Sequence, residues 1–139
     1  MIEAECEIIA QFYDLDPMQV VWHGNYIRYF EQVRGLLLDK IDYNYPQMER
    51  SGYLWPIVDM RVKYVRPVRY QQRIRVRAAL TEYENRLRID YRCLDGGSGE
   101  VLTKAHTIQV AVNAATGELN LESPPVLLER VKKVLCAGA

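Results

Sequence analysis

The 139-residue chain contains few cysteines and histidines, carries no net charge and has no long apolar run. Cys6, Cys93 and Cys136 lie far apart in the sequence, so they predict neither a disulfide framework nor a CxxC pair. His23 and His106 are also widely separated, and a structural zinc site would need four ligands gathered from scattered positions. We therefore predict ordinary free thiols and no metal site.

The absence of net charge leaves no global field that would attract nucleic acid or an anionic membrane. No apolar run approaches the ~20 residues that a membrane-spanning helix needs. The acidic start, residues 1–5, lacks the basic and apolar regions of a signal peptide. With 49% hydrophobic residues, the sequence predicts a soluble cytoplasmic protein with a single globular domain over residues 1–139.

The hydrophobic pattern changes period near Gly24. Residues 3–13 alternate between apolar and polar side chains, which predicts a half-buried strand. From about Gly24, apolar residues recur at three- and four-residue steps, which predicts a helix of about 17 residues with a wide apolar face. That face includes Tyr26, Ile27, Phe30, Val33, Leu37, Leu38 and Ile41. Such a helix needs a sheet to pack against.

The second half of the chain is dominated by strand patterns. After a loop over residues 42–56, strands are predicted at 57–66, 72–83, 86–94 and about 101–112, followed by a short helix at 126–135. The predicted face of the first of these strands holds Val58, Met60, Val62 and Tyr64. One long helix against a five-stranded, largely antiparallel sheet, with four strands in a meander, is an α+β fold. Because its edge strands would stay unpaired, we expect a homodimer or a homotetramer.

Residues 13–26 form the most informative segment, because two acids, a proline, a histidine and a glycine lie between the first strand and the helix. Asp16 is a candidate base or nucleophile just ahead of the helix. The alternative is a turn acid, because Asp-Pro is a frequent turn pair and Asp14 could equally cap an element. The apolar run Val20-Val21-Trp22 favours a segment that lies against the core and partly buries Asp16.

His23, Gly24 and Asn25 stand where the helix begins. The first N–H groups of a helix have no internal partners and lie at the positive end of its dipole. A carbonyl placed there would be polarised, and one good donor to its oxyanion contributes ~3 kcal/mol. Gly24 permits close backbone approach because it has no Cβ. The alternatives are a capping or core role for His23 and an N-cap role for Asn25.

The same residues resemble the signature of hotdog-fold acyl-CoA thioesterases of the 4-hydroxybenzoyl-CoA thioesterase and YbgC type. Asp16-Pro17 matches the catalytic acid and its neighbour, and residues 20–26 match the run that opens the central helix. Residues 64–70 are similar to the family's Tyr-x-x-Pro-Ala-x-Tyr segment. The resemblance covers essentially the whole chain, in the order of its elements as well as in its motifs.

The resemblance implies hydrolysis of a thioester of coenzyme A or of acyl carrier protein, without a cofactor. It implies that Asp16 is the nucleophile or the general base, and that backbone N–H groups at His23 and Gly24 polarise the carbonyl. It places Trp22, Asn25 and Tyr26 at the substrate. Nucleic acid and membrane are not expected as partners.

The chain departs from the family pattern at two positions near these motifs. The family usually has glycine where this chain has Gln19, so we expect the turn after Asp16 to differ in shape. An aspartate commonly follows the Tyr-x-x-Pro segment, where this chain has Gln72. Neither residue is the proposed catalytic acid, so both departures concern the shape of the pocket and hence the substrate.

Arginine is concentrated in one part of the chain, since nine of its thirteen arginines fall between Arg61 and Arg92. One interpretation is a solvated strand face, which the alternation of Arg73, Arg75 and Arg77 favours. The other is phosphate binding, which suits guanidinium geometry and for which Arg66 and Arg69 are the first candidates.

Three further features have two interpretations each. The aromatic residues of the 42–56 loop either line an acyl pocket or cover the end of the core; they are Tyr43, Tyr45, Tyr53 and Trp55. Glu31 faces either a dimer cleft or solvent, and His106 is interpreted as a buried or edge residue without a catalytic role.

A non-catalytic acyl-thioester-binding module is the main alternative function. A hotdog dehydratase is less favoured, because His23 stands at the start of the helix.

Overall fold

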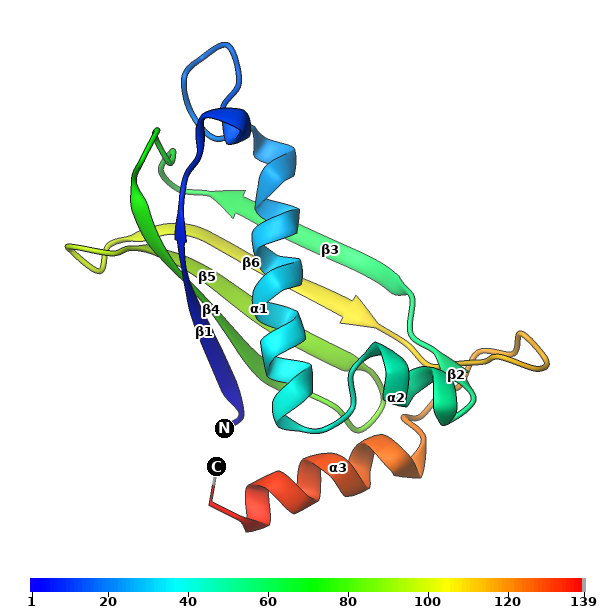
Figure 1. Ribbon diagram of the computed structural model, residues 1–139. Coiled ribbons are helices and arrows are strands. Elements are labelled where there is room, and N and C mark those ends of the chain that lie inside the picture. Colours follow the sequence, from blue (N-terminus) through cyan, green and yellow to red (C-terminus); the bar gives the residue numbers. More distant parts are fainter. Residues whose placement is uncertain (139) are drawn as a thin grey trace.

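The computed structural model describes residues 1–138 (Figure 1). Its main elements are the strands β1 (Glu3–Ile9), β3 (Ile57–Tyr64), β4 (Arg73–Glu82), β5 (Leu87–Asp95) and β6 (Val101–Gln109), and the helices α1 (Tyr26–Lys40) and α3 (Pro125–Cys136). Shorter elements are the 3-10 turns η1 (Phe12–Asp14) and η2 (His23–Asn25), the helix α2 (Tyr45–Arg50) and the strands β2 (Tyr53–Leu54) and β7 (Val112–Asn113). The predicted α+β class is confirmed.

Five strands form one antiparallel sheet in the order β1-β4-β5-β6-β3. The predicted meander of four strands is wrong in one respect, because only β4, β5 and β6 pair in sequence order. β3 pairs instead with β6, at the edge opposite β1. Alternation along a strand indicates which residues share a face, but it does not identify the neighbouring strand. This topology puts β3 at an open edge of the sheet.

The helix α1 lies across one face of the sheet (Figure 1). It is 15 residues long, and η2 directly precedes it, so the helical segment begins near the predicted position. Its buried residues are Tyr26, Tyr29, Phe30, Val33, Leu37 and Leu38. Of the predicted apolar face only Ile27 is exposed, at 41%.

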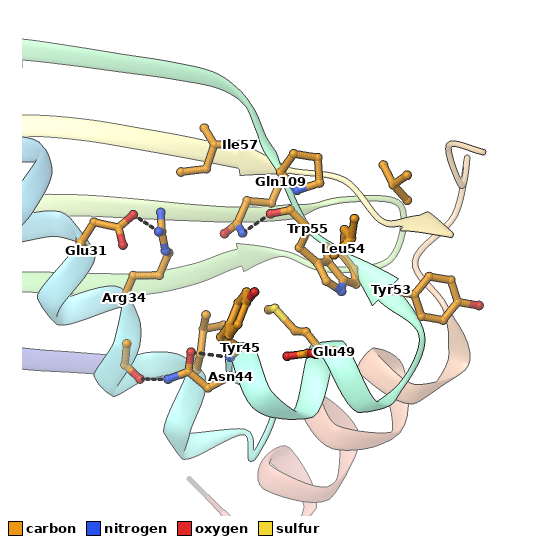
Figure 2. Close-up of a pocket in the computed structure, with 15 residues that line it drawn as sticks. Glu31, Arg34, Asn44, Tyr45, Glu49, Tyr53, Leu54, Trp55, Ile57 and Gln109 are labelled. Atoms are coloured by element: carbon orange, nitrogen blue, oxygen red, sulfur yellow. Dashed lines mark hydrogen bonds and ion pairs between the residues drawn. The ribbon is translucent and has the colours of Figure 1, made fainter. Parts of the chain in front are cut away.

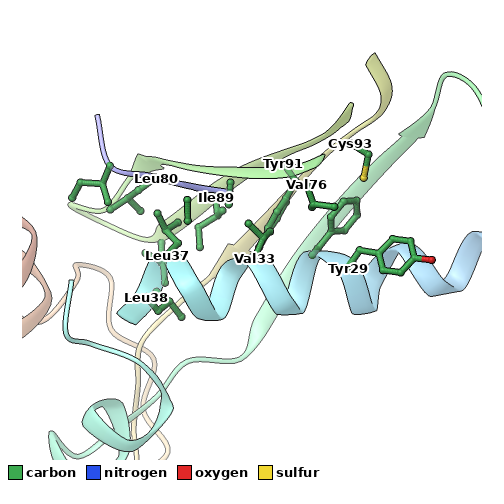
Figure 3. Close-up of a cluster of buried hydrophobic side chains, with 14 of the residues drawn as sticks. Tyr29, Val33, Leu37, Leu38, Val76, Leu80, Ile89, Tyr91 and Cys93 are labelled. Atoms are coloured by element: carbon green, nitrogen blue, oxygen red, sulfur yellow. The ribbon is translucent and has the colours of Figure 1, made fainter. Parts of the chain in front are cut away.

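The core lies between α1 and the inward-facing residues of β4 and β5 (Figure 3). The ring of Phe30 stacks on that of Tyr91, with centroids 4.8 Å apart. The hydroxyl of Tyr91 shares a hydrogen bond of 2.8 Å with Thr107, which satisfies both polar groups inside the core. At the far end of α1, Leu127 and Val131 of α3 are fully buried and close the core.

The predicted loop over residues 42–56 contains regular structure that the sequence pattern did not reveal. Asn44 and Gln47 form a reciprocal capping box at the start of α2, and Pro46 occupies its first turn. The following strand β2 pairs with β7. A helix of six residues is too short to show a periodic apolar face, which explains why it was missed.

The edge strand β3 is largely exposed. Val58 and Tyr64 are 57% and 47% exposed, although both belong to the predicted apolar face of this strand. Val62 is partly buried against the core. Within residues 1–138, no helix combines the length and apolar character required to cross a bilayer.

Candidate active site

The two sequence motifs meet at a small pocket of about 230 Å³. The first motif contributes Asp16, His23 and Tyr26 to its walls, and the chain leaving β3 contributes a second set. The lining residues are Asp16, Met18, Val20, Val21, His23, Tyr26, Tyr64, Val65, Arg66 and Pro67. The fold thus brings a partly buried carboxylate to the start of the central helix.

A tight turn fixes the backbone of Asp16. Its N–H donates to the carbonyl of Val20 at 2.9 Å, and its carbonyl accepts from the N–H of Gln19 at 2.9 Å. The Asp16 side chain accepts from the N–H of Met18 at 2.8 Å through Oδ1. This bond orients the carboxylate, and no bond to Oδ2 is present within residues 1–138.

Gln19 completes the turn with a φ of 64°, in the left-handed region that favours glycine. The structure thus places a glutamine in a backbone conformation that suits glycine. Such a residue carries a local strain of roughly 1 kcal/mol. A turn shape that differs from that of the family stays a prediction.

Asp14 anchors the segment between the two 3-10 turns. Its side chain is buried and accepts from the N–H of Gln11 at 2.9 Å. Its carbonyl accepts from the N–H of Trp22 at 2.9 Å and from Nδ2 of Asn25 at 2.8 Å. Asn25 therefore does not cap the helix with its side chain, and it lies outside the pocket lining. It holds the start of α1 against the preceding turn.

Two backbone N–H groups stand at the start of the helical segment. Among residues 1–138, the N–H groups of His23 and Gly24 have no hydrogen-bond partner, whereas those of Trp22 and Asn25 are both occupied. Gly24 lies directly under the Trp22 ring, because an added Cβ would lie 2.4 Å from it unless the ring or the turn moved. Trp22 is 48% exposed, lies outside the pocket and tilts over the His23 ring at 5.2 Å.

Two tyrosines of the first turn of α1, Tyr26 and Tyr29, are buried. Burial raises the pKa of Tyr26, which lines the pocket. Burial and the nearby Asp14 carboxylate raise the pKa of Tyr29, whose hydroxyl has no hydrogen-bond partner within the described residues. Both phenols therefore remain protonated at neutral pH.

The two candidate phosphate-binding arginines are placed differently. Arg66 lines the pocket and pairs with Glu100 at 2.7 Å, with both side chains largely exposed. Arg69 lies outside the lining, and its backbone forms a bridge with Val20. Its N–H donates to Oε1 of Gln72 at 2.9 Å. Only Arg66 is placed beside Asp16.

The second departure from the family, Gln72, connects two turns. Its Nε2 donates to Asp95 at 2.9 Å. Hydrogen bonds from Ser98 and Gln72 lower the pKa of the Asp95 carboxyl to about 2. Gln72 thus supports the segment around Arg69 without contacting the pocket.

A second and larger cavity, of about 550 Å³, lies beside the later half of α1 (Figure 2). Tyr45, Tyr53 and Trp55 line it, whereas Tyr43 is buried in the core and accepts from Nε1 of Trp55 at 3.1 Å. Three of the aromatic residues of this region thus line a cavity, and Tyr43 belongs to the core. Glu31 also lines the cavity.

Two polar residues of this cavity, Arg34 and Gln109, were not predicted from the sequence. Arg34 pairs with Glu31, and Gln109 donates through Nε2 to the carbonyl of Trp55 at 2.7 Å. The Oε1 atom of Gln109 is buried and has no partner in residues 1–138. No sequence signal distinguishes Gln109 from other polar residues of β6, because its partner is 54 positions away.

The chain belongs to the Thioesterase-like superfamily, whose family profile matches residues 10–131. Its architecture, in which a central helix packs against a five-stranded antiparallel sheet, is the hotdog fold. YneP of Bacillus subtilis, which is named as a candidate acyl-CoA thioesterase, is 27% identical over 107 residues, covering 77% of this chain and 78% of that protein. The predicted family is thus confirmed.

Solved structures agree with this assignment. A DHNA-CoA thioesterase from Staphylococcus aureus is 27% identical and has a TM-score of 0.83, covering 99% of this chain and 94% of its own. Slr0204 of Synechocystis, a 1,4-dihydroxy-2-naphthoyl-CoA thioesterase, has a TM-score of 0.81 at 17% identity, covering 96% of each chain. At the latter identity the likeness shows the fold alone.

Proposed function

We propose that this protein hydrolyses acyl thioesters of coenzyme A or of acyl carrier protein, with Asp16 as the reacting carboxylate. The observation that carries the proposal is that Asp16 and His23 line one pocket, and that the N–H groups of His23 and of the adjacent Gly24 are unpaired among the described residues. Attack on a carbonyl requires a base or nucleophile and hydrogen-bond donors for the oxyanion, and this carboxylate and these two N–H groups can supply both. The named activities of the relatives support the substrate class.

The thioester carbonyl oxygen would accept hydrogen bonds from the N–H groups of His23 and Gly24. In one route, Asp16 removes a proton from water while the water oxygen bonds to the carbonyl carbon. The C–S bond then breaks, and the thiolate takes a proton to leave as a thiol. In the other route, the Asp16 carboxylate itself bonds to the carbonyl carbon, and the C–S bond breaks to release the thiolate, which takes a proton. Water then hydrolyses the resulting anhydride and regenerates the Asp16 carboxylate.

The remaining substrate contacts follow from the lining of the pocket. Tyr26 and Tyr64 present aromatic surface next to the reacting carbonyl, and Arg66 at the rim can contact a phosphate of the carrier. Trp22, Asn25 and Arg69 support the site from outside it. No metal or redox cofactor enters this scheme.

The larger cavity beside α1 is the proposed acyl pocket. Its apolar walls suit an aromatic or aliphatic group, and Oε1 of Gln109 would accept a hydrogen bond from a donor on that group. Within one chain, Tyr26 lines the small pocket and Glu31 the larger cavity, which separates the two by a rise of ~7.5 Å along α1. A homodimer, which the exposed edge strand β3 supports, would let one copy provide Asp16 and its partner provide the cavity.

The test is the release of free thiol from a panel of acyl-CoAs, from benzoyl to long-chain, by wild type, Asp16→Asn and the surface control Glu122→Gln. We expect turnover by wild type and by the control, and a fall of at least ~100-fold in Asp16→Asn, which corresponds to about 2.7 kcal/mol. Acyl-CoA binding without turnover, unchanged by Asp16→Asn, would instead indicate a binding module.

A further inference from the structure

The face of the sheet that α1 leaves uncovered carries a row of four cations. Strand register places Arg77 opposite Arg92, Arg92 opposite Lys104, and Lys104 opposite Lys63. Because Tyr91 and Cys93 are buried in the core, the intervening Arg92 side chain points to the opposite face. We call Arg77, Arg92, Lys104 and Lys63 the basic row.

This arrangement is unfavourable for the isolated chain. Like charges directly opposite one another on adjacent strands destabilise a sheet. Arg77 is compensated by Glu5, with 3.1 Å between Nε and Oε2. Within residues 1–138, the other three members of the row have no acidic partner at ion-pair distance. The row therefore presents uncompensated positive charge to solvent.

The row borders a hollow of about 470 Å³ on this face. Arg61 extends the positive charge into the next row, opposite His106. The hollow also contains one acid, Asp90, but its Oδ1 is already bonded to Arg88 at 3.2 Å. Arg61, Lys63, Arg92 and Lys104 are all exposed side chains. The hollow is thus a predominantly cationic surface.

The dimensions of the row indicate what it fits. Neighbouring strands are ~4.8 Å apart, so four strands spread the cations over ~14 Å. Acidic residues at i, i+4 and i+8 along an α-helix recur every ~6 Å, which is close to this spacing. An acidic helix lying across the strands would therefore bring successive carboxylates close to successive cations.

Two other occupants fit less well. A second copy would bring the same positive charge to this face, so sheet-on-sheet self-association is repelled. A nucleic-acid backbone that continued along the row would meet the exposed glutamates of β1, where Glu5 lies directly opposite Arg77. Because Glu5 lies beside the row, this face favours a ligand whose negative charge extends no further than the row itself.

The position of the row relates it to the reaction. Lys63 is the penultimate residue of β3, and the chain that follows the strand, residues 65–67, lines the Asp16 pocket. A flexible arm attached to a partner on this face would reach the Asp16 pocket by passing the end of β3. We propose that the helix-free face docks an acidic helix of the protein that carries the acyl thioester. This identification of the partner rests on the proposed function.

The test measures binding without catalysis. Fluorescently labelled acyl carrier protein that lacks its phosphopantetheine arm is titrated with wild type, with Arg92→Glu/Lys104→Glu and with the control Arg50→Glu/Lys132→Glu. The control reverses two exposed charges on α2 and α3 and so changes net charge equally. We expect salt-dependent binding by wild type, a loss of at least ~10-fold in the first variant and a change below ~2-fold in the control.

A second readout separates docking from chemistry. With the same acyl group on both carriers, the Arg92→Glu/Lys104→Glu variant should lose kcat/KM on the carrier-protein substrate and keep it on the acyl-CoA. Equal binding by both variants would overturn the proposal, as would stronger competition by an oligonucleotide or by tripolyphosphate than by unlabelled carrier protein. Binding without hydrolysis would contradict the proposed function alone.

Discussion

The hydroxyl of Tyr64 donates a hydrogen bond to the backbone carbonyl of His23 across 2.7 Å. The two residues are 41 positions apart, and their rings also meet edge to face at 6.4 Å. The bond joins the end of the edge strand β3 to the 3-10 turn that precedes α1. Because the N–H groups of His23 and Gly24 belong to that turn, β3 helps to set the geometry of the proposed oxyanion site.

Removal of this bond should affect catalysis more than folding. Tyr64→Phe keeps the ring and loses the hydroxyl, so we expect a loss of ~1 kcal/mol of unfolding free energy. We expect kcat to fall ~10-fold with little change in KM, since the displaced donors act on the oxyanion. Urea unfolding and steady-state kinetics measure both quantities. Tyr70→Phe, an exposed tyrosine, is the matched control, and an equal effect there would contradict the assignment.

Gly24→Ala tests the contact between Gly24 and the indole of Trp22. The new Cβ would lie 2.4 Å from the ring, so either the ring or the turn must move. Overpacking of this kind destabilises by ~1–3 kcal/mol, and turnover should fall because the Gly24 N–H shifts. Without the Trp22 ring, the new Cβ no longer meets this obstacle. Gly24→Ala should therefore reduce turnover little in the Trp22→Ala background, so the double variant should be nearly as active as Trp22→Ala. Additive losses in that cycle would show that the ring is not the obstacle.

The sequence predicts the central helix well because its apolar residues recur over four turns, from Tyr26 to Leu38. Alternation along β3 does not predict its neighbour, since pairing with β6 depends on the path of the whole chain. The short helix α2 depends on one capping box rather than on a periodic face. The local motif identifies the pocket residues Asp16 and His23. The anchors Asp14 and Tyr64 bond to backbone groups of other residues, and side-chain patterns do not reveal such partners.

Gln19 offers a test of strain at the departure from the family pattern. Gln19→Gly removes the left-handed strain but increases the entropy of the unfolded chain, so we expect a net stabilisation of at most ~1 kcal/mol. Gln19→Val should destabilise by ~1–2 kcal/mol, because a β-branched residue tolerates a positive φ poorly. The free energy of unfolding of the two variants, measured by chemical denaturation, tests both expectations. A destabilised glycine variant would mean that the glutamine side chain itself supports the turn.

The thiol of Cys93 should make the fold sensitive to alkali. Burial raises the pKa of Cys93 from 9.0 to about 12, so the folded state resists loss of its proton. The resulting stabilisation is complete below pH 9.0 and is lost as the pH rises towards about 12. Cys6 and the buried tyrosines, whose pKa values are also raised, act in the same direction.

The measurement is the free energy of unfolding from pH ~8 to ~10.5 for wild type, Cys93→Ala and Cys136→Ala. Cys93→Ala should be less stable at the lower pH and should lose less on going to the higher pH. Cys136 is exposed, and its removal should leave the slope unchanged. Parallel curves for wild type and Cys93→Ala would contradict the prediction.

The homodimer is tested by sedimentation. We expect the 16.2 kDa chain to sediment with twice that mass. Val58→Asp places a charge at the exposed part of β3, so it should shift the equilibrium towards the monomer and reduce turnover in proportion. Glu122→Asp is a control that leaves β3 intact. Full activity in a proven monomer would show that one copy provides the complete site.

The chain has only two tryptophans, and they occupy opposite environments. Trp55 is buried at the wall of the larger cavity, whereas half-exposed Trp22 rests on Gly24 beside His23. A Trp55→Phe variant would therefore carry its one tryptophan next to the reacting groups, and Trp22→Phe would carry its one tryptophan at the proposed acyl pocket. Emission from each variant would report, without any added label, when a ligand arrives at either end of the helix.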